Sequence, residues 1–322
     1  MVLHTRFTSL MECTAPIQQA GMGWVSGIDL AVAVANAGAL GMVAFPLAPP
    51  PVLTQLLDQV TARTRGAVGL NVIVPFLDDP ACLDIAAQRL RLVEFFWADP
   101  DPDLVARVHS GGALAAWQVG SLREAKAAQD AGCDLVVVQG TEAGGHLRGE
   151  RALLPLPDEV LDAVDLPVVA AGGIATGRGV AAVLAAGAAA ARLGTRFVAT
   201  DEADAHPDYK RALVAATETE ITDTFAVMWP DAPHRVIASC VERARATEAE
   251  FVGDIEFGGA EMRVPARSMV SPTSTTRGDI AAMALYAGQS VGAIGAVEPA
   301  GRVVAGLLTE AEKLLGEHPG PR

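Results

Sequence analysis

The chain has 322 residues, of which 51% are hydrophobic, 19% charged and 5% aromatic, so it can bury a sizeable core and is not a disordered protein. Its 24 Lys and Arg against 38 Asp and Glu give a net charge of −14, which argues against nucleic acid and membrane surfaces as main partners. Four widely spaced cysteines without a CxxC motif, and an N-terminus without a signal-peptide run, predict a cytoplasmic protein with reduced thiols.

Short apolar runs typical of strands alternate along the first two thirds of the chain with Ala-rich runs typical of helices. The predicted strands cover residues 15–20, 40–44, 67–73, 92–96, 113–118, 134–139, 167–171 and 189–193. The predicted helices cover residues 27–37, 52–63, 80–90, 102–109, 121–131, 157–163 and 177–186. Strand followed by helix, repeated about eight times, predicts an α/β fold of the (β/α)8 TIM-barrel type. A doubly wound sheet is the structural alternative.

The rest of the chain lacks this alternation. Helices are expected at 207–220, 241–252, 279–287 and 300–315, and an irregular Gly-, Pro-, Ser- and Thr-rich segment at 253–279. We therefore expect three parts. Residues 1–204 form the barrel, residues 205–270 form a small, mainly helical subdomain inserted after strand 8, and residues 271–322 supply C-terminal helices that pack on the barrel.

Glycines at the predicted strand ends suggest a phosphate site, because active sites of such barrels lie at the C-terminal ends of the strands. Gly172-Gly173 follows the seventh strand and Gly194-Thr195 follows the eighth. Glycine lets the backbone approach a phosphate closely, although these residues could also simply make tight turns. The segment 21–27 (GMGWVSG) is one residue too long for a GxGxxG dinucleotide motif and better fits backbone that lines a flat cofactor ring.

His146 is the candidate acid or base, since it closes a Gly-rich loop, 140–146, after the sixth strand. An ordinary imidazole pKa near 6.5 suits proton transfer near neutral pH, and a purely structural histidine is the alternative. No HExxH motif, paired histidines or Cys/His cluster indicates a metal, and no GxSxG motif indicates a nucleophilic serine.

Several blocks of sequence resemble the nitronate monooxygenase family, formerly called 2-nitropropane dioxygenases. They are PIQQAGMGWVSGIDLAVAVANAGALGMV (16–43), GLNV (69–72), VVVQGTEAGGH (136–146), PVVAAGGIATGRGVAAVLAAGAAAARLGTRF (167–197), DEADAHPDYK (201–210) and MALYAGQSVG (283–292). The combination of EAGGH, AAGGI and GTRF is shared with the FMN-dependent enoyl-acyl-carrier-protein reductases, which are barrels of the same build.

The resemblance implies FMN bound without a covalent link and His146 as the catalytic residue. Residues of the flavin site would be Ala20, Gly21 and Met22 along the isoalloxazine, Asn71 and Gln139 as hydrogen-bonding partners, Gly144 through its backbone, and Gly173, Arg192, Leu193, Gly194 and Thr195 around the phosphate. The sequence departs from the family where Ala20-Gly21-Met22 replaces Ala-Pro-Met and where Arg192-Leu193 replaces Gln-Met. Trp97, in a segment that is usually richer in glycine, is expected to reshape the pocket.

The leading hypothesis is FMN-dependent oxidation of an alkyl nitronate or nitroalkane by O2 to a carbonyl compound and nitrite, with His146 as acid or base. The alternative is an NAD(P)H-dependent FMN reductase that acts on an enoyl thioester or a quinone. A barrel that binds flavin or phosphate without catalysis is a third hypothesis. For the assembly of the protein, a homodimer is the hypothesis.

Overall fold

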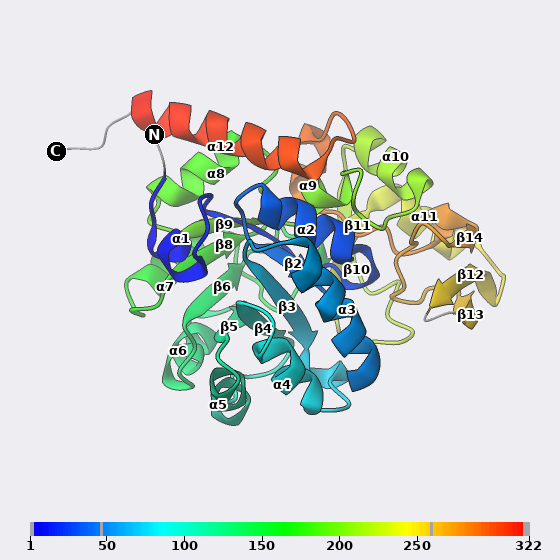
Figure 1. The fold of residues 1–322 in the computed structure, drawn as a ribbon. Coiled ribbons are helices and arrows are strands. Elements are labelled where there is room, and N and C mark those ends of the chain that lie inside the picture. Colours follow the sequence, from blue (N-terminus) through cyan, green and yellow to red (C-terminus); the bar gives the residue numbers. More distant parts are fainter. Residues whose placement is uncertain (1–2, 46–47, 258–259, 318–322) are drawn as a thin grey trace.

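The computed structural model describes residues 3–45, 48–257 and 260–317, and its central feature is a single sheet of eight parallel strands (Figure 1). The strand order is β1-β9-β8-β6-β5-β4-β3-β2. The bounds are β1 Ile17–Gln19, β2 Gly41–Val43, β3 Val68–Ile73, β4 Leu92–Phe96, β5 Leu114–Val119, β6 Leu135–Gln139, β8 Val168–Ala171 and β9 Ala190–Leu193. A parallel bridge between Gln18 and Leu40 joins β1 to β2 and closes the sheet. The predicted (β/α)8 barrel is therefore confirmed, and a doubly wound sheet is not.

Helices follow the strands and cover the outside of the barrel. Their bounds are α2 Ile28–Asn36, α3 Pro50–Arg63, α4 Ala81–Ala87, α5 Pro102–Ser110, α6 Leu122–Asp130, α7 Pro155–Leu161 and α8 Gly177–Ala185. Side-chain caps fix several of their starts close to the preceding strand: Asp101 accepts from the second amide of α5, and Ser121 and Thr176 accept from the third amides of α6 and α8. These caps hold the strand–helix loops, which form the upper face of the barrel.

Alternation along the strands separates an inner from an outer core. On β6, Val136 and Val138 pack outward with the helices, whereas Leu135 and Val137 point into the barrel. Phe7, which is fully buried, belongs to the inner cluster and comes from a short helix, α1 Arg6–Met11, that the sequence analysis did not predict. Apolar side chains thus close the N-terminal end of the barrel and leave the C-terminal end for polar groups.

The chain after β9 contains helices and also strands. The elements are α9 Thr195–Val198, α10 Pro207–Ala215, β10 Thr219–Thr222, β11 His234–Ile237, α11 Ala238–Ala246, β12 Phe251–Phe257, β13 Ala260–Pro265 and β14 Arg277–Gly278. Figure 1 shows α10, α11 and these strands together on one side of the barrel. Strand β11 pairs with β10 and with β7 Gly145–His146, so this part of the chain reaches the loop that carries His146.

Two predictions for this region need correction. The segment 253–279 is not irregular throughout, because β12 and β13 form an antiparallel hairpin and β14 pairs with β12, although residues 266–276 between β13 and β14 lie in no helix or strand. Glycine at 253 and charged residues along both strands mask their alternation in the sequence. Residues 279–287 do not form a helix beyond the short 3-10 turn η3 Ile280–Ala282. The helices expected near 207–220 and 241–252 are present as the shorter α10 and the earlier α11. The division into three parts stays a prediction.

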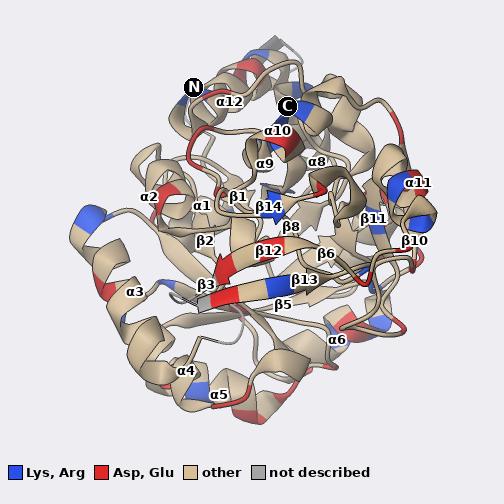
Figure 2. Cartoon of the chain, turned by 90° about the vertical axis from the view of Figure 1, so that its right-hand side faces the viewer, with Lys and Arg blue, Asp and Glu red and all other residues tan. Residues whose placement is uncertain are grey.

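The C-terminal helix α12, Ala300–Glu317, packs against α8 and α2, as expected for the predicted helix at 300–315 (Figure 1). The Glu310 carboxylate on α12 accepts from the Gly177 amide over 2.8 Å and so binds the first turn of α8. Further 3-10 turns are η1 Gly23–Val25, η2 Val74–Phe76 and η4 Gln289–Ala293. In Figure 2, acidic and basic residues lie on the outer helices, on loops and on the strands β12, β13 and β14. None of the described helices combines the length and apolarity that a membrane span requires.

Candidate functional site

A pocket lies at the C-terminal ends of the barrel strands, and it brings together nearly all the residues that the sequence analysis selected. Its walls include Ala20, Gly21, Met22, Asn71, Gln139, Gly144, His146, Gly173, Arg192, Gly194 and Thr195. Leu193 is the exception, since its side chain is 1% exposed and packs in the core. The Leu193 carbonyl accepts from the Ala20 amide over 2.9 Å, so this residue joins the ends of β1 and β9.

The floor of the pocket rests on a buried carboxylate that the sequence analysis did not select. Glu94 on β4 is fully buried and accepts from Gln18 Nε2 at 2.7 Å, Asn71 Nδ2 at 2.8 Å and Arg192 Nη1 at 2.7 Å. The register of the sheet places these groups together, because Asn71 is opposite Glu94 and Gln18 is opposite Arg192. A carboxylate so buried requires such partners. Because Nδ2 of Asn71 donates to Glu94, its Oδ1 can accept a hydrogen bond from a molecule in the pocket.

Close backbone contacts shape the walls. A Cβ atom on Gly21 would lie 2.3 Å from Cβ of Asn71, and a Cβ on Gly144 would lie 2.6 Å from the backbone of Ala287 and Gly288. The Gly288 amide donates to Oγ1 of Thr195 over 2.9 Å. Glycine at these positions lets three segments distant in sequence meet around the pocket.

The loops after β8 and β9 present backbone amides to the pocket. Gly173 has φ +62°, a left-handed conformation that favours glycine, and a Cβ there would lie 2.9 Å from Cβ of Glu142. Within the described part of the chain, the amides of Gly173 and Gly194 donate no hydrogen bond. Thr195 begins α9, so its amide has no acceptor within that helix. These groups form a cradle that suits an anion such as a phosphate.

The first turn of α8 contributes less to that cradle than its position suggests. Oγ1 of Thr176 caps this helix by accepting from the Gly179 amide over 3.2 Å. The Gly177 amide is bound by Glu310. Two donors of this helix terminus are therefore already used, and an anion at this end of the barrel would rely on Gly173, Gly194 and Thr195.

The imidazole of His146 lies in an aromatic box on the other side of the pocket. It stacks on Trp229 with ring centroids 4.1 Å apart and an interplanar angle of 29°. The rings of His234, Tyr286 and Trp97 lie 5.2, 5.4 and 6.0 Å away. Nε2 of His146 is buried and has no hydrogen-bond partner among the described residues. A buried nitrogen without a partner is a candidate for contact with a bound molecule.

This environment changes the acid–base properties assumed from the sequence. Burial, and secondarily the neighbouring His234, lowers the pKa of His146 from its ordinary value to about 3. Burial also lowers the pKa of His234, whose Nε2 accepts from the Phe225 amide over 3.2 Å. The pKa of His146 therefore lies below the unperturbed value near 6.5, and the imidazole is neutral at pH 7.

Sequence reasoning missed most of the box. It assigned no chemistry to His234, and it did not select Trp229 or Tyr286, which stand more than 80 residues after His146. The pairing of β7 with β11 sets His234 opposite His146, and the loop before β11 brings Trp229 onto the ring. The ring of Trp97 lies edge-on to His146, and its backbone has φ +68°, which is uncommon for a bulky residue. Its predicted effect on the shape of the pocket stays a prediction.

The family model for nitronate monooxygenase matches residues 4–90 and 81–310. The chain belongs to the nitronate monooxygenase family. Family membership makes it an enzyme, an oxidoreductase of a group of flavoenzymes. A probable nitronate monooxygenase of Bacillus subtilis is 31% identical over 265 residues, which cover 68% of this chain and 76% of that protein.

A higher identity is found with a relative that is named for a different activity. The (3aS,4S,5R,7aS)-5-hydroxy-7a-methyl-1-oxo-octahydro-1H-indene-4-carboxyl-CoA dehydrogenase of Rhodococcus jostii is 37% identical over 235 residues, or 73% of this chain. The match spans 66% of that relative's length, just under two thirds.

Solved structures confirm the fold and the two similarities expected from the sequence, to nitroalkane-oxidising enzymes and to FabK. FabK from Thermotoga maritima superimposes with a TM-score of 0.82 at 28% identity and covers 98% of both chains. Nitroalkane oxidase from Streptomyces ansochromogenes superimposes with a TM-score of 0.77 at 32% identity, covering 96% of this chain and 99% of that one. The chain therefore shares its barrel with both the nitroalkane-oxidising and the FabK branches.

Proposed function

We propose that this protein binds FMN in the pocket and oxidises an alkyl nitronate, or the parent nitroalkane, with O2 as the final oxidant. The observation that carries the proposal is the position of His146. Its unpartnered Nε2 belongs to the same pocket as the amide cradle at Gly173, Gly194 and Thr195. The family and the likeness to nitroalkane oxidase support the reaction class.

The residues present fit the cofactor. Gly173, Gly194 and Thr195 would hold the phosphate through main-chain amides and a hydroxyl, and Arg192 would add a positive charge near the pocket floor. Ala20, Gly21 and Met22 would lie along the ring system, with Asn71 and Gln139 as polar contacts and Gly144 as a close backbone approach. When bound, FMN supplies the redox chemistry by accepting electrons from the substrate and returning them to O2.

The protein's own task is to bind a small anion and control one proton. In the tautomer that carries its proton on Nε2, the neutral imidazole would donate that N–H to a nitronate oxygen. With a neutral nitroalkane, Nε2 would instead accept the α-proton, and the developing nitronate charge would favour the imidazolium. The rings of Trp229, Trp97 and Tyr286 keep water from this nitrogen. Oxidation at the substrate carbon, which gains an oxygen atom from O2 or water, and breakage of the carbon–nitrogen bond would then yield a carbonyl compound and nitrite.

A second candidate is redox chemistry on a thioester. The 37% identity to a carboxyl-CoA dehydrogenase and the fit to FabK favour it, as does the GMGWV sequence at 21–25, which departs from the usual nitronate monooxygenase pattern. In this case His146 would contact the carbonyl or the α-carbon of an acyl thioester, and NAD(P)H or the thioester itself would supply the electrons.

Anaerobic mixing of the flavin-loaded protein with each reductant separates the two candidates. Rapid bleaching of the oxidised flavin by an alkyl nitronate, but not by NADH, NADPH or a saturated acyl-CoA, is the result expected of a nitronate monooxygenase. Admission of O2 should then restore the colour and release nitrite. Bleaching by NAD(P)H or by acyl-CoA, with no response to nitronate, would overturn the primary proposal in favour of the second.

A further inference from the structure

We propose that Arg148 is a positioning residue that holds the His146 imidazole in its reactive place. Its guanidinium links the loop after β6 to the loops after β4 and β5 through ion pairs with Asp99 and Glu124. Arg148 is not among the residues that line the pocket, and its expected effect on activity rests on the function proposed above.

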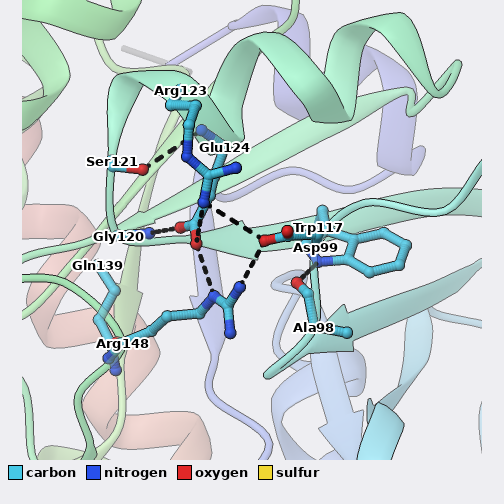
Figure 3. A network of polar contacts seen from close by, with 9 residues as sticks. All are labelled: Ala98, Asp99, Trp117, Gly120, Ser121, Arg123, Glu124, Gln139 and Arg148. Atoms are coloured by element: carbon cyan, nitrogen blue, oxygen red, sulfur yellow. Dashed lines mark hydrogen bonds and ion pairs between the residues drawn. The ribbon is translucent and has the colours of Figure 1, made fainter.

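Arg148 follows His146 by two residues, and its guanidinium bridges two carboxylates (Figure 3). Nε donates to Oε1 of Glu124 over 2.7 Å, and Nη2 donates to Oδ1 of Asp99 over 2.8 Å. The Arg148 side chain is 18% exposed and that of Glu124 is 7% exposed, so this ion pair is largely shielded from water. The other oxygen of Glu124 accepts from the Gly120 amide over 2.8 Å, which anchors the carboxylate to the end of β5.

Gln139 transmits this anchoring to His146. Its Nε2 donates to the His146 carbonyl over 2.9 Å, and its Oε1 accepts from the Arg148 amide over 3.3 Å. One side-chain amide thus holds the backbone on both sides of Leu147. Beyond Arg148 the chain passes directly over the turn after β5, since a Cβ on Gly149 would lie 2.2 Å from the Gly120 carbonyl oxygen.

Asp99 extends the same connection to the neighbour of the imidazole. It stands two residues after Trp97, whose ring lies edge-on to His146 at 6.0 Å. The intervening Ala98 carbonyl accepts from Nε1 of Trp117 over 2.9 Å (Figure 3). The left-handed Trp97 backbone is therefore held by contacts on the residues that follow it. A planar guanidinium can bind both carboxylates at once, which a lysine ammonium at this place cannot match.

Arg123 provides a matched control within the same cluster. Its guanidinium lies 3.4 Å from Asp99 and 3.8 Å from Glu124, but its side chain is 69% exposed and its segment does not carry His146. Arg123→Gln removes the same charge beside the same carboxylates. If the cluster served only general stability, the two arginine variants would affect His146 alike.

The test compares Arg148→Gln and Arg123→Gln in the flavin-loaded protein by two readouts. Histidine-selective ¹H–¹⁵N NMR follows the pKa of His146, whose titratable neighbours in the box are His234 and Tyr286. We expect Arg148→Gln to raise this pKa by about one unit, because a loosened loop admits water to the ring, and Arg123→Gln to leave it unchanged. The second readout is the ratio of kcat/KM for a neutral nitroalkane to kcat/KM for its nitronate. We expect this ratio to fall about tenfold in Arg148→Gln alone, since only the nitroalkane requires a well-placed base.

The outcomes separate this proposal from the function it rests on. A His146 pKa and a substrate ratio equal to those of the unmodified protein, with only a lower melting temperature, would overturn the positioning role. If neither nitro substrate turns over, the proposed function fails and the NMR titration alone decides for or against Arg148. Should Arg148→Gln not fold, Arg148→Lys is judged by the same criteria, with a smaller shift in the same direction expected.

Discussion

Nη1 of Arg192 lies 2.7 Å from Oε1 of Glu94 inside the barrel, where the two side chains are 6% and 0% exposed. The same carboxylate oxygen accepts from Asn71, so one buried group orients two residues of the pocket. Arg192 is also a position at which the sequence departs from the glutamine usual in its family. A cation there depends on its carboxylate, because an unpaired buried charge is costly.

The variant Glu94→Gln should therefore destabilise the protein more than an ordinary polar substitution. We expect the free energy of unfolding to fall by about 3 kcal/mol, since the guanidinium is left buried without its counter-charge. Urea denaturation at neutral pH measures the change. The double variant Glu94→Gln/Arg192→Gln should recover most of the loss. Equal stability of Glu94→Gln and the unmodified protein would show that the pair is not electrostatically important.

Gly173→Ala tests the amide cradle. A Cβ would lie 2.9 Å from Cβ of Glu142 and would require left-handed backbone from alanine, so the loop must shift. Gly112→Ala is the matched control, with φ +93° but open space around the new Cβ at the start of β5. Both changes should cost about 1 kcal/mol of stability. We expect only Gly173→Ala to weaken FMN binding, by about tenfold or more, in a fluorescence titration. Equal affinities in the two variants would remove the phosphate role from this loop.

His146→Asn separates cofactor binding from proton transfer. Asparagine can still hydrogen-bond but cannot act as a base, so FMN should remain bound while turnover of a neutral nitroalkane falls by about 100-fold or more. Turnover of the preformed nitronate should fall less, because its proton is already gone. Steady-state kinetics on the two substrates, at matched flavin content, measure the difference. Unchanged turnover of the nitroalkane would refute a base role for His146.

The lowered pKa of His146 also predicts how stability depends on pH. The unfolded chain binds a proton at this residue below about pH 6.5, whereas the folded chain does so only near pH 3. The contribution of His146 to the free energy of unfolding is therefore fully present above the pKa of the unfolded chain. It is lost as the pH falls toward the pKa of the folded chain, by about 1.4 kcal/mol per pH unit. Urea denaturation between about pH 4.5 and pH 7 should show a shallower dependence for His146→Asn. His234 contributes in the same direction in both proteins. Parallel pH profiles for the two proteins would contradict the buried, neutral imidazole.

The barrel was predictable because its signals are local. Each apolar strand run is followed by a helical run, some helices begin at a side-chain cap such as Ser121 or Thr176, and eight strand–helix repeats leave few other folds. The place of the glycines and of His146 was predictable because the C-terminal ends of parallel strands all lie on one face of the barrel. The hairpin of β12 and β13 was not, since glycine and charged residues interrupt its alternation and its stability comes from pairing rather than composition.

The residues that orient and surround the pocket's polar groups could not be predicted from the sequence, for a different reason. Glu94 stands in LVEFF as a single acid in an apolar run, and only the register with Asn71 and its position across from Gln18 and Arg192 give it partners. Trp229 belongs to a loop 83 positions after His146 and meets it only because β11 pairs with β7. Such contacts depend on tertiary pairing, which no local pattern encodes.

The visible absorption spectrum of the purified protein, followed by removal of any flavin and titration with FMN, tests the central claim most directly. We expect a yellow protein with the absorption bands of oxidised flavin and, after stripping, a single FMN taken up tightly by each chain, with affinity reduced in Gly173→Ala. A colourless protein that binds no FMN under these conditions would contradict the assignment of this pocket as a flavin site.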